Sequence, residues 1–68
     1  MMHAKKKIIK PNKTARHRAL APHTTLYIME IVKEFPDERN SQFKCRYFSE
    51  GKFFTEIFYG FELELIEN

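Results

Sequence analysis

The residues of this chain that could support nucleophilic or metal chemistry are one cysteine and three histidines. Cys45 lies inside the aromatic run QFKCRYF, whereas a reactive thiol needs an electropositive, partly exposed setting beside a base. His3, His17 and His23 are spaced fourteen and six residues apart, and there is no second cysteine to complete a zinc set. The sequence also contains no Gly-rich phosphate loop and no nucleophile elbow. We predict that Cys45 is a core residue, and that the protein is not an enzyme and uses no metal or cofactor.

Charged residues are segregated along the chain. The first 23 residues hold seven Lys or Arg and no acidic residue, so they carry +7, whereas residues 24–68 hold nine acidic and five basic residues and carry −4. All ten aromatic residues lie in the acidic stretch. The segment that can bind a polyanion and the segment that can build a core therefore differ. We predict a flexible basic arm over residues 1–18 and a small domain over residues 19–68.

The length of 68 residues allows one domain, and its stability should be marginal. The roughly 45 residues with core-forming composition are just above the ~40 below which a disulfide, a metal or a partner is usually needed. A single cysteine fits a reducing compartment, so we predict a cytoplasmic location. No apolar run approaches the ~18 residues of a membrane span, and the arm lacks the serines typical of organelle targeting peptides.

The apolar pattern predicts an antiparallel β-domain. The stretch TTLYIMEIVKEF favours a strand near 26–35 over a helix, because it has no N-cap box and Pro36 ends the run. Residues 1–13 show no period and are expected to lack fixed structure. So few strands must curl to cover a core, which predicts an all-β fold, a small antiparallel SH3-like barrel of four to five strands. The other strands are expected near 42–48, 52–59 and 62–67, and a short first strand at 17–21 would make five.

The clearest local signal is a hairpin around Gly51. A three-residue loop of Ser49, Glu50 and Gly51, with Gly51 at positive φ, would pair Phe48 with Lys52 and set Cys45 opposite Thr55. A two-residue Glu50-Gly51 turn would instead set Cys45 opposite the charged Glu56. We predict the three-residue loop, since it keeps one face of the hairpin apolar.

One functional class that fits this layout is nucleic-acid binding. A basic arm is attracted to phosphate without regard to sequence, and counterion release supplies the free energy. The outward face of the predicted hairpin adds cations beside rings on which bases could stack. The candidate nucleic-acid-binding residues are Lys5, Lys6, Lys7, Lys10, Lys13, Arg16, Arg18, Lys44, Arg46, Lys52, Phe48 and Phe54.

The other class is a protein-interaction or regulatory module. The last seven residues contain Glu62, Glu64 and Glu67, and the final strand is expected at a sheet edge, which can accept a strand from a partner. The acidic residues at this edge should also attract the protein's own basic arm. We therefore expect a protein partner or self-association, with nucleic acid as the alternative partner and no small-molecule substrate.

The body of the chain resembles a known family. The stretch PHTTLYIMEI, followed by FKCRYFSEGKF and then FYGFELELI, looks like the small bacterial proteins of the YodC-like, SH3-like barrel family. The resemblance spans roughly residues 19–66. It implies a small barrel and implies no activity, because the family's own function is unknown.

Overall fold

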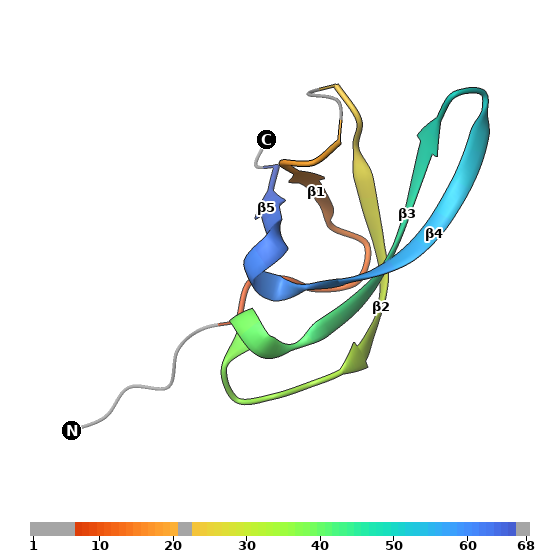
Figure 1. Ribbon diagram of the computed structural model, residues 1–68. Helices are drawn as coiled ribbons and strands as arrows, with labels where there is room; N and C mark the ends of the chain where they lie inside the picture. The colour runs from red at the N-terminus through yellow and green to blue at the C-terminus, as the bar shows by residue number, and fades with distance from the viewer. Residues whose placement is uncertain (1–6, 21–22, 67–68) are drawn as a thin grey trace.

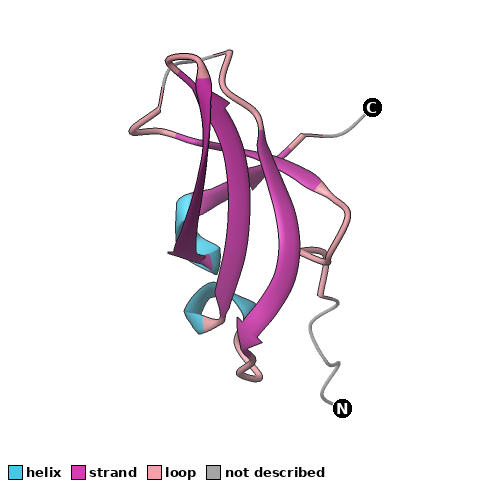
Figure 2. Ribbon diagram, turned by 90° about the vertical axis from the view of Figure 1, so that its right-hand side faces the viewer, coloured by secondary structure: helices cyan, strands magenta, loops and turns pink. Residues whose placement is uncertain are grey.

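Five antiparallel strands form one curled sheet in the computed structural model, which describes residues 7–20 and 23–66 (Figures 1 and 2). The strand order is β4-β3-β2-β1-β5. The all-β, barrel-like fold expected from the sequence is confirmed. Among the described residues, no helix is long and apolar enough to cross a membrane. The strands are β1 (Thr14–His17), β2 (Leu26–Lys33), β3 (Gln42–Ser49), β4 (Lys52–Tyr59) and β5 (Leu63–Leu65).

The core lies on the concave side of this sheet. Leu26 and Ile28 of β2 and Phe43 and Cys45 of β3 are at most 1% exposed, which confirms Cys45 as a core residue. Burial raises the pKa of the Cys45 thiol to about 11, so the thiol stays protonated and is a poor nucleophile. Two register shifts in the β2–β3 ladder, the first directly after Ile28, interrupt the alternation of buried and exposed side chains in β2.

The first strand lies earlier than expected. It spans Thr14–His17 and not 17–21, because Ala15 is small enough to be fully buried between Leu26 and Leu65, its partners on the two neighbouring strands. The stretch that was expected to form this strand instead begins a turn, in which the Leu20 N–H donates to the His17 carbonyl at 3.0 Å.

Part of the expected arm belongs to the folded body. Ile9 is 7% exposed, and its N–H donates to the Glu38 carboxylate at 2.7 Å. The Asn12 N–H donates to the Ile28 carbonyl, and the Ile28 N–H donates in return to the Lys13 carbonyl. The boundary expected at residue 18 is therefore corrected, since the contacts that order the chain begin before β1. The first six residues of the expected arm lie outside the described residues.

The β3–β4 hairpin has a two-residue turn, so the expected three-residue loop is wrong. Ser49 pairs with Lys52, and Glu50 and Gly51 have φ of 51° and 80°. Positive φ at both central residues is the type I′ geometry, whose twist matches that of the flanking strands. The positive φ expected at Gly51 is confirmed.

The observed register sets Cys45 opposite Glu56, the arrangement that looked chemically worse in the sequence. It is tolerated because Glu56 is exposed and accepts a hydrogen bond from the Tyr47 hydroxyl at 2.5 Å. That hydrogen bond, with burial and the negative charge of Glu56, raises the pKa of Tyr47. The carboxylate therefore gains a partner on the concave side instead of lying against the thiol alone.

Two short 3-10 turns, η1 (Glu38–Asn40) and η2 (Gly60–Glu62), pack together below the sheet ends. Gly60 is buried, and its N–H donates to the Ser41 carbonyl at 2.9 Å. A Cβ at this position would collide with the backbone oxygen of Glu38 and lie 3.2 Å from the Arg39 Cα. The glycine is needed here for close backbone approach. Because η2 immediately precedes β5, the final strand begins at Leu63 and not at residue 62. It ends at Leu65, and residue 67 of the expected strand lies outside the described residues.

Substitution of the two glycines should therefore destabilise the protein for different reasons. Gly60→Ala should lower the free energy of unfolding by about 3 kcal/mol, since rigid backbone must move to accept the methyl group. Gly51→Ala should cost only about 1 kcal/mol, because space is open there and just the left-handed backbone is strained. Urea unfolding followed by circular dichroism measures both.

The matched control is Gly51→Asn, which should be nearly neutral because Asn tolerates positive φ. An equal or smaller loss at Gly60 than at Gly51 would contradict the close packing of η1 against η2.

Candidate functional site

The convex side of the β2–β3–β4 sheet carries exposed rings around one arginine. We call the set Tyr27, Lys44, Arg46, Phe48 and Phe53 the basic–aromatic face. Tyr27 pairs with Arg46 across β2 and β3, and Phe48 pairs with Phe53 across β3 and β4. Residues directly opposite one another in an antiparallel pair lie on the same side of the sheet. The face is therefore assembled by register from three neighbouring strands.

Arg46 is at the centre of the basic–aromatic face. Its guanidinium lies 4.3 Å from the centre of the Phe53 ring, a cation–π contact. Phe48 meets Phe53 edge-on, with ring centres 5.0 Å apart. The Tyr27 hydroxyl donates to the Asn12 side-chain oxygen at 2.8 Å, which fixes the ring from the other side. The rings are thus held in place by neighbours although they are exposed.

The exposure of these rings is high for a small domain. Tyr27 is 45%, Phe48 55% and Phe53 60% exposed, and Arg46 is exposed as well. Single exposed hydrophobic residues need no explanation, but several that adjoin one another mark a binding surface. At the edge of the face, Lys44 is opposite Glu30, so its charge is partly offset. Arg46 is the main positive charge available to a ligand on this face.

Of the five predicted hairpin residues, the structure brings only Lys44, Arg46 and Phe48 together. Lys52 and Phe54 lie on the concave side, where Phe54 stacks on Tyr47 with ring centres 5.4 Å apart. The Lys52 ammonium is 5.7 Å from the Phe54 ring centre. A change of one residue in register moves every β4 side chain to the opposite face. This explains why Lys52 and Phe54 lie on the concave side and not on the convex side.

Phe53 and Tyr27 are the members of the face that the predicted set lacks. The two-residue Glu50-Gly51 turn, the alternative that the sequence allowed, would have indicated Phe53. In that register Phe53 lies opposite Phe48. Tyr27 lies in a strand that reads as apolar on both sides, so the sequence gives no sign of which way its ring faces.

Those basic residues of the expected arm that the structure describes do not form one cluster. Lys5 and Lys6 lie outside the described residues. The Lys7 ammonium forms an ion pair with the Glu34 carboxylate at 2.9 Å and also donates to the Phe35 carbonyl. Arg16 is opposite Glu64 in the β1–β5 ladder, so part of the expected arm does lie against the acidic final strand. The remaining arm cations are exposed: Lys10, Lys13 and Arg18.

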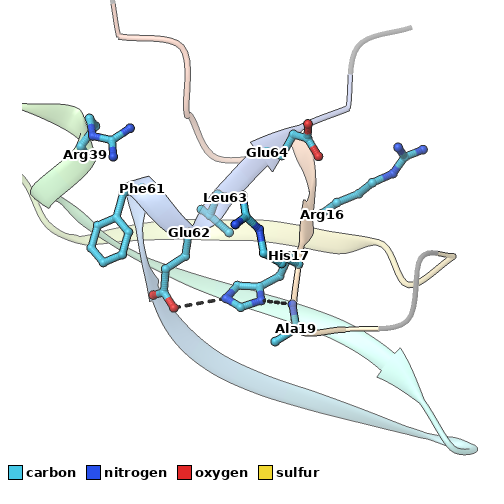
Figure 3. A pocket seen from close by; sticks show the side chains of 9 residues that line it. Arg16, His17, Ala19, Arg39, Phe61, Glu62, Leu63 and Glu64 are labelled. Atoms are coloured by element: carbon cyan, nitrogen blue, oxygen red, sulfur yellow. Dashed lines mark hydrogen bonds and ion pairs between the residues drawn. The ribbon is translucent and has the colours of Figure 1, made fainter.

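A groove of about 640 Å³ lies between β1, η1 and η2 (Figure 3). Its lining residues are Arg16, His17, Arg18, Ala19, Arg39, Phe61, Glu62, Leu63 and Glu64. The His17 Nδ1 accepts a hydrogen bond from the Ala19 N–H at 3.0 Å, so the ring proton is on Nε2, which donates to a Glu62 oxygen at 3.1 Å. The other Glu62 oxygen accepts from the Tyr59 N–H at 2.8 Å.

This His17–Glu62 pair is a structural clasp between β1 and η2. Both ring nitrogens and both carboxylate oxygens have partners within the protein, so the two side chains are held in fixed orientations. Figure 3 shows Arg16 directed away from the pair. In the part of the chain that the structure describes, no three His, Cys, Asp or Glu side chains gather closely enough to hold a metal ion.

Comparison of the chain with protein-family models, with curated proteins and with solved structures finds no match. The resemblance to YodC-like proteins therefore stays a prediction from the quoted residues.

The clasp should make stability sensitive to acid. The Tyr59 N–H, and then the hydrogen bond from His17, hold the pKa of Glu62 below its ordinary 4.5 against the opposing effect of burial. A carboxyl group whose pKa is lowered on folding stabilises the protein above its unfolded pKa, and this contribution is lost as pH falls through the folded pKa. Between about pH 5 and about pH 3, wild type should therefore lose more unfolding free energy than Glu62→Gln.

Urea unfolding at several pH values measures the difference. Glu64→Gln is the matched control, because Glu64 is exposed on the neighbouring strand and its side chain makes no hydrogen bond to the described residues. Identical pH profiles for wild type and Glu62→Gln would contradict the clasp.

Proposed function

We propose that the protein is a non-enzymatic binding module whose basic–aromatic face binds single-stranded nucleic acid. The observation that carries the proposal is the position of the Arg46 guanidinium over the exposed Phe53 ring, with Phe48 and Tyr27 beside it. Such a group offers a cation for a phosphate and flat surfaces for bases in the same place.

Stacking on the face is favoured because the rings are already ordered. Phe53 is held by Arg46 and Phe48, and Tyr27 is held by Asn12, so little side-chain entropy remains to be lost on binding. Every base has a π-face, so stacking is tolerant of sequence and contributes about 1–3 kcal/mol per base. Sequence preference is therefore expected to be weak.

A single strand suits this surface better than a duplex. Bases in a duplex are stacked on one another and do not present their faces to a protein surface. The exposed cations of the expected arm, Lys10, Lys13 and Arg18, would add phosphate contacts that do not depend on sequence.

A protein-interaction module is the second candidate. The observation that favours it is the β4 strand, which is at the end of the strand order and has β3 as its only partner among the described strands. An unpaired strand edge can accept a strand from another chain. Salt distinguishes the two candidates, since phosphate contacts weaken steeply with salt whereas strand addition does not.

Two substitutions test the nucleic-acid proposal. Phe53→Ala and Arg46→Ala should each weaken binding of fluorescently labelled oligodeoxythymidine by roughly 5- to 100-fold, as expected for the loss of one stacked base or its neighbouring cation. Arg46→Ala should also make the slope of log K against log salt shallower by about 0.7. Fluorescence anisotropy at several salt concentrations measures both effects.

Phe61→Ala is the matched control, because Phe61 is 55% exposed but lies at the opposite end of β4, against Tyr59. It should leave affinity unchanged. Failure of the full chain to bind single strands at ~50 mM salt, where electrostatic binding is strong, would refute the proposal and favour the protein-interaction module.

A further inference from the structure

The outer edge of β4 has open hydrogen-bonding groups. The residues that flank a two-residue hairpin turn form a hydrogen-bonded pair, and such pairs alternate along an antiparallel ladder. Backbone groups of the even-numbered residues, from Lys52 to Phe58, therefore point at β3, and those of Phe53, Thr55 and Ile57 point away. The hydrogen bond of the Gly60 N–H to Ser41 and that of the Tyr59 N–H to the Glu62 side chain agree with this alternation.

Both the position and the side chains of this edge leave it accessible. The turn end of the β3–β4 hairpin lies apart from β1 and β5 (Figure 1). Phe53 and Ile57, on the convex side of β4, are 60% and 55% exposed. Tyr59 closes one end of the edge, because Glu62 already accepts its N–H. The open segment is therefore 53–57, a length that suits pairing with one other strand.

We propose that this edge pairs with the β4 edge of a second copy of the chain, antiparallel about a two-fold axis at Phe54. In this register Lys52 of each copy is opposite Glu56 of the other, and the two Phe54 rings meet at the axis. Phe53 and Thr55 exchange backbone hydrogen bonds with Thr55 and Phe53 of the other copy. Charge complementarity selects the occupant, because the strand KFFTE is its own partner when it is reversed.

Two other registers with the same hydrogen-bond phase are less favourable. An axis at Thr55 would place Glu56 against Phe54 and Lys52 against the buried Phe58. An axis at Glu56 would set the two Glu56 carboxylates opposite one another, and it would need the Tyr59 N–H, which already donates to Glu62. Like charges directly opposite in a ladder are destabilising. The axis at Phe54 avoids both problems.

Pairing in this way would join two five-stranded sheets into one continuous sheet and cover the open edge of β4 in each copy. It uses backbone groups and the concave-side charges, and it leaves Arg46 and Phe48 free. Self-association is thus independent of the proposed nucleic-acid binding, and either can fail without the other.

A charge exchange tests the pairing in the absence of nucleic acid. Lys52→Glu and Glu56→Lys should each weaken the dimer by roughly tenfold or more, because each turns two opposite-charge pairs into like-charge pairs. The double variant Lys52→Glu/Glu56→Lys should restore the wild-type dissociation constant. Sedimentation equilibrium measures the constants, and thermal unfolding of each variant shows whether it folds.

A cross-link provides a second, geometric test. Phe54→Cys places two thiols directly across the axis in a non-hydrogen-bonded pair, whose Cα separation of about 4.5 Å suits a disulfide. It should form a disulfide-linked dimer under mild oxidation, whereas the control Thr55→Cys, which is opposite Phe53, should not. The buried Cys45 should not take part.

Three outcomes would overturn the proposal. One is a monomeric wild-type protein up to about millimolar concentration, which corresponds to less than about 4 kcal/mol of association free energy. Another is a double charge variant that stays as weak as the singles. The third is a cross-link at Thr55 that forms more readily than the cross-link at Phe54.

Discussion

The register of the β3–β4 hairpin is the constraint on which the candidate site depends. Glu50 and Gly51 both have positive φ, so the turn contains two residues and fixes the pairing of every residue along β3 and β4. Because side chains alternate, that pairing decides which rings enter the core and which face solvent. Phe58 is buried and Phe53 is exposed for this reason. A loop one residue longer would exchange the two faces of β4, so that Phe54 and not Phe53 would lie on the side of Arg46.

The extent of β2, β3 and β4 could be predicted from sequence because apolar alternation and the punctuation at Pro36 and Gly51 are local signals. The register could not, because it depended on a choice between two turns that the local residues both allow. Glu56 opposite Cys45 is unfavourable when only the facing pair is considered. The diagonal hydrogen bond from Tyr47 gives the carboxylate a partner on the concave side. Pairwise chemistry across a ladder is thus incomplete when a long side chain reaches past its own partner.

The misplaced first strand has a different cause. Composition groups Thr14–His17 with the basic arm, and nothing within the segment shows that Ala15 fills a gap between Leu26 and Leu65. Strand β1 forms because β2 and β5 pair with it on its two edges. This is a tertiary effect that no local sequence pattern encodes. The clasp between His17 and Glu62 is non-local in the same sense, since it joins groups 45 residues apart. The same clasp explains why the final glutamates are not simply a solvated face, for one of them fixes the end of β4.

Small size links the stability of this protein to its surfaces. A sheet of five short strands buries only a few large side chains fully, so it cannot also cover Phe48, Phe53 and Ile57, which remain exposed on the β3–β4 hairpin. Their exposure lowers solubility unless a partner covers them. The geometry of the hairpin suits two different partners. The rings around Arg46 face away from the sheet and suit a flat ligand, whereas the backbone of β4 points along the sheet and suits another strand. Because these directions are perpendicular, the two surfaces do not compete. Occupation of the edge would even place the basic–aromatic faces of two copies on one continuous sheet, where a single flexible strand could contact both.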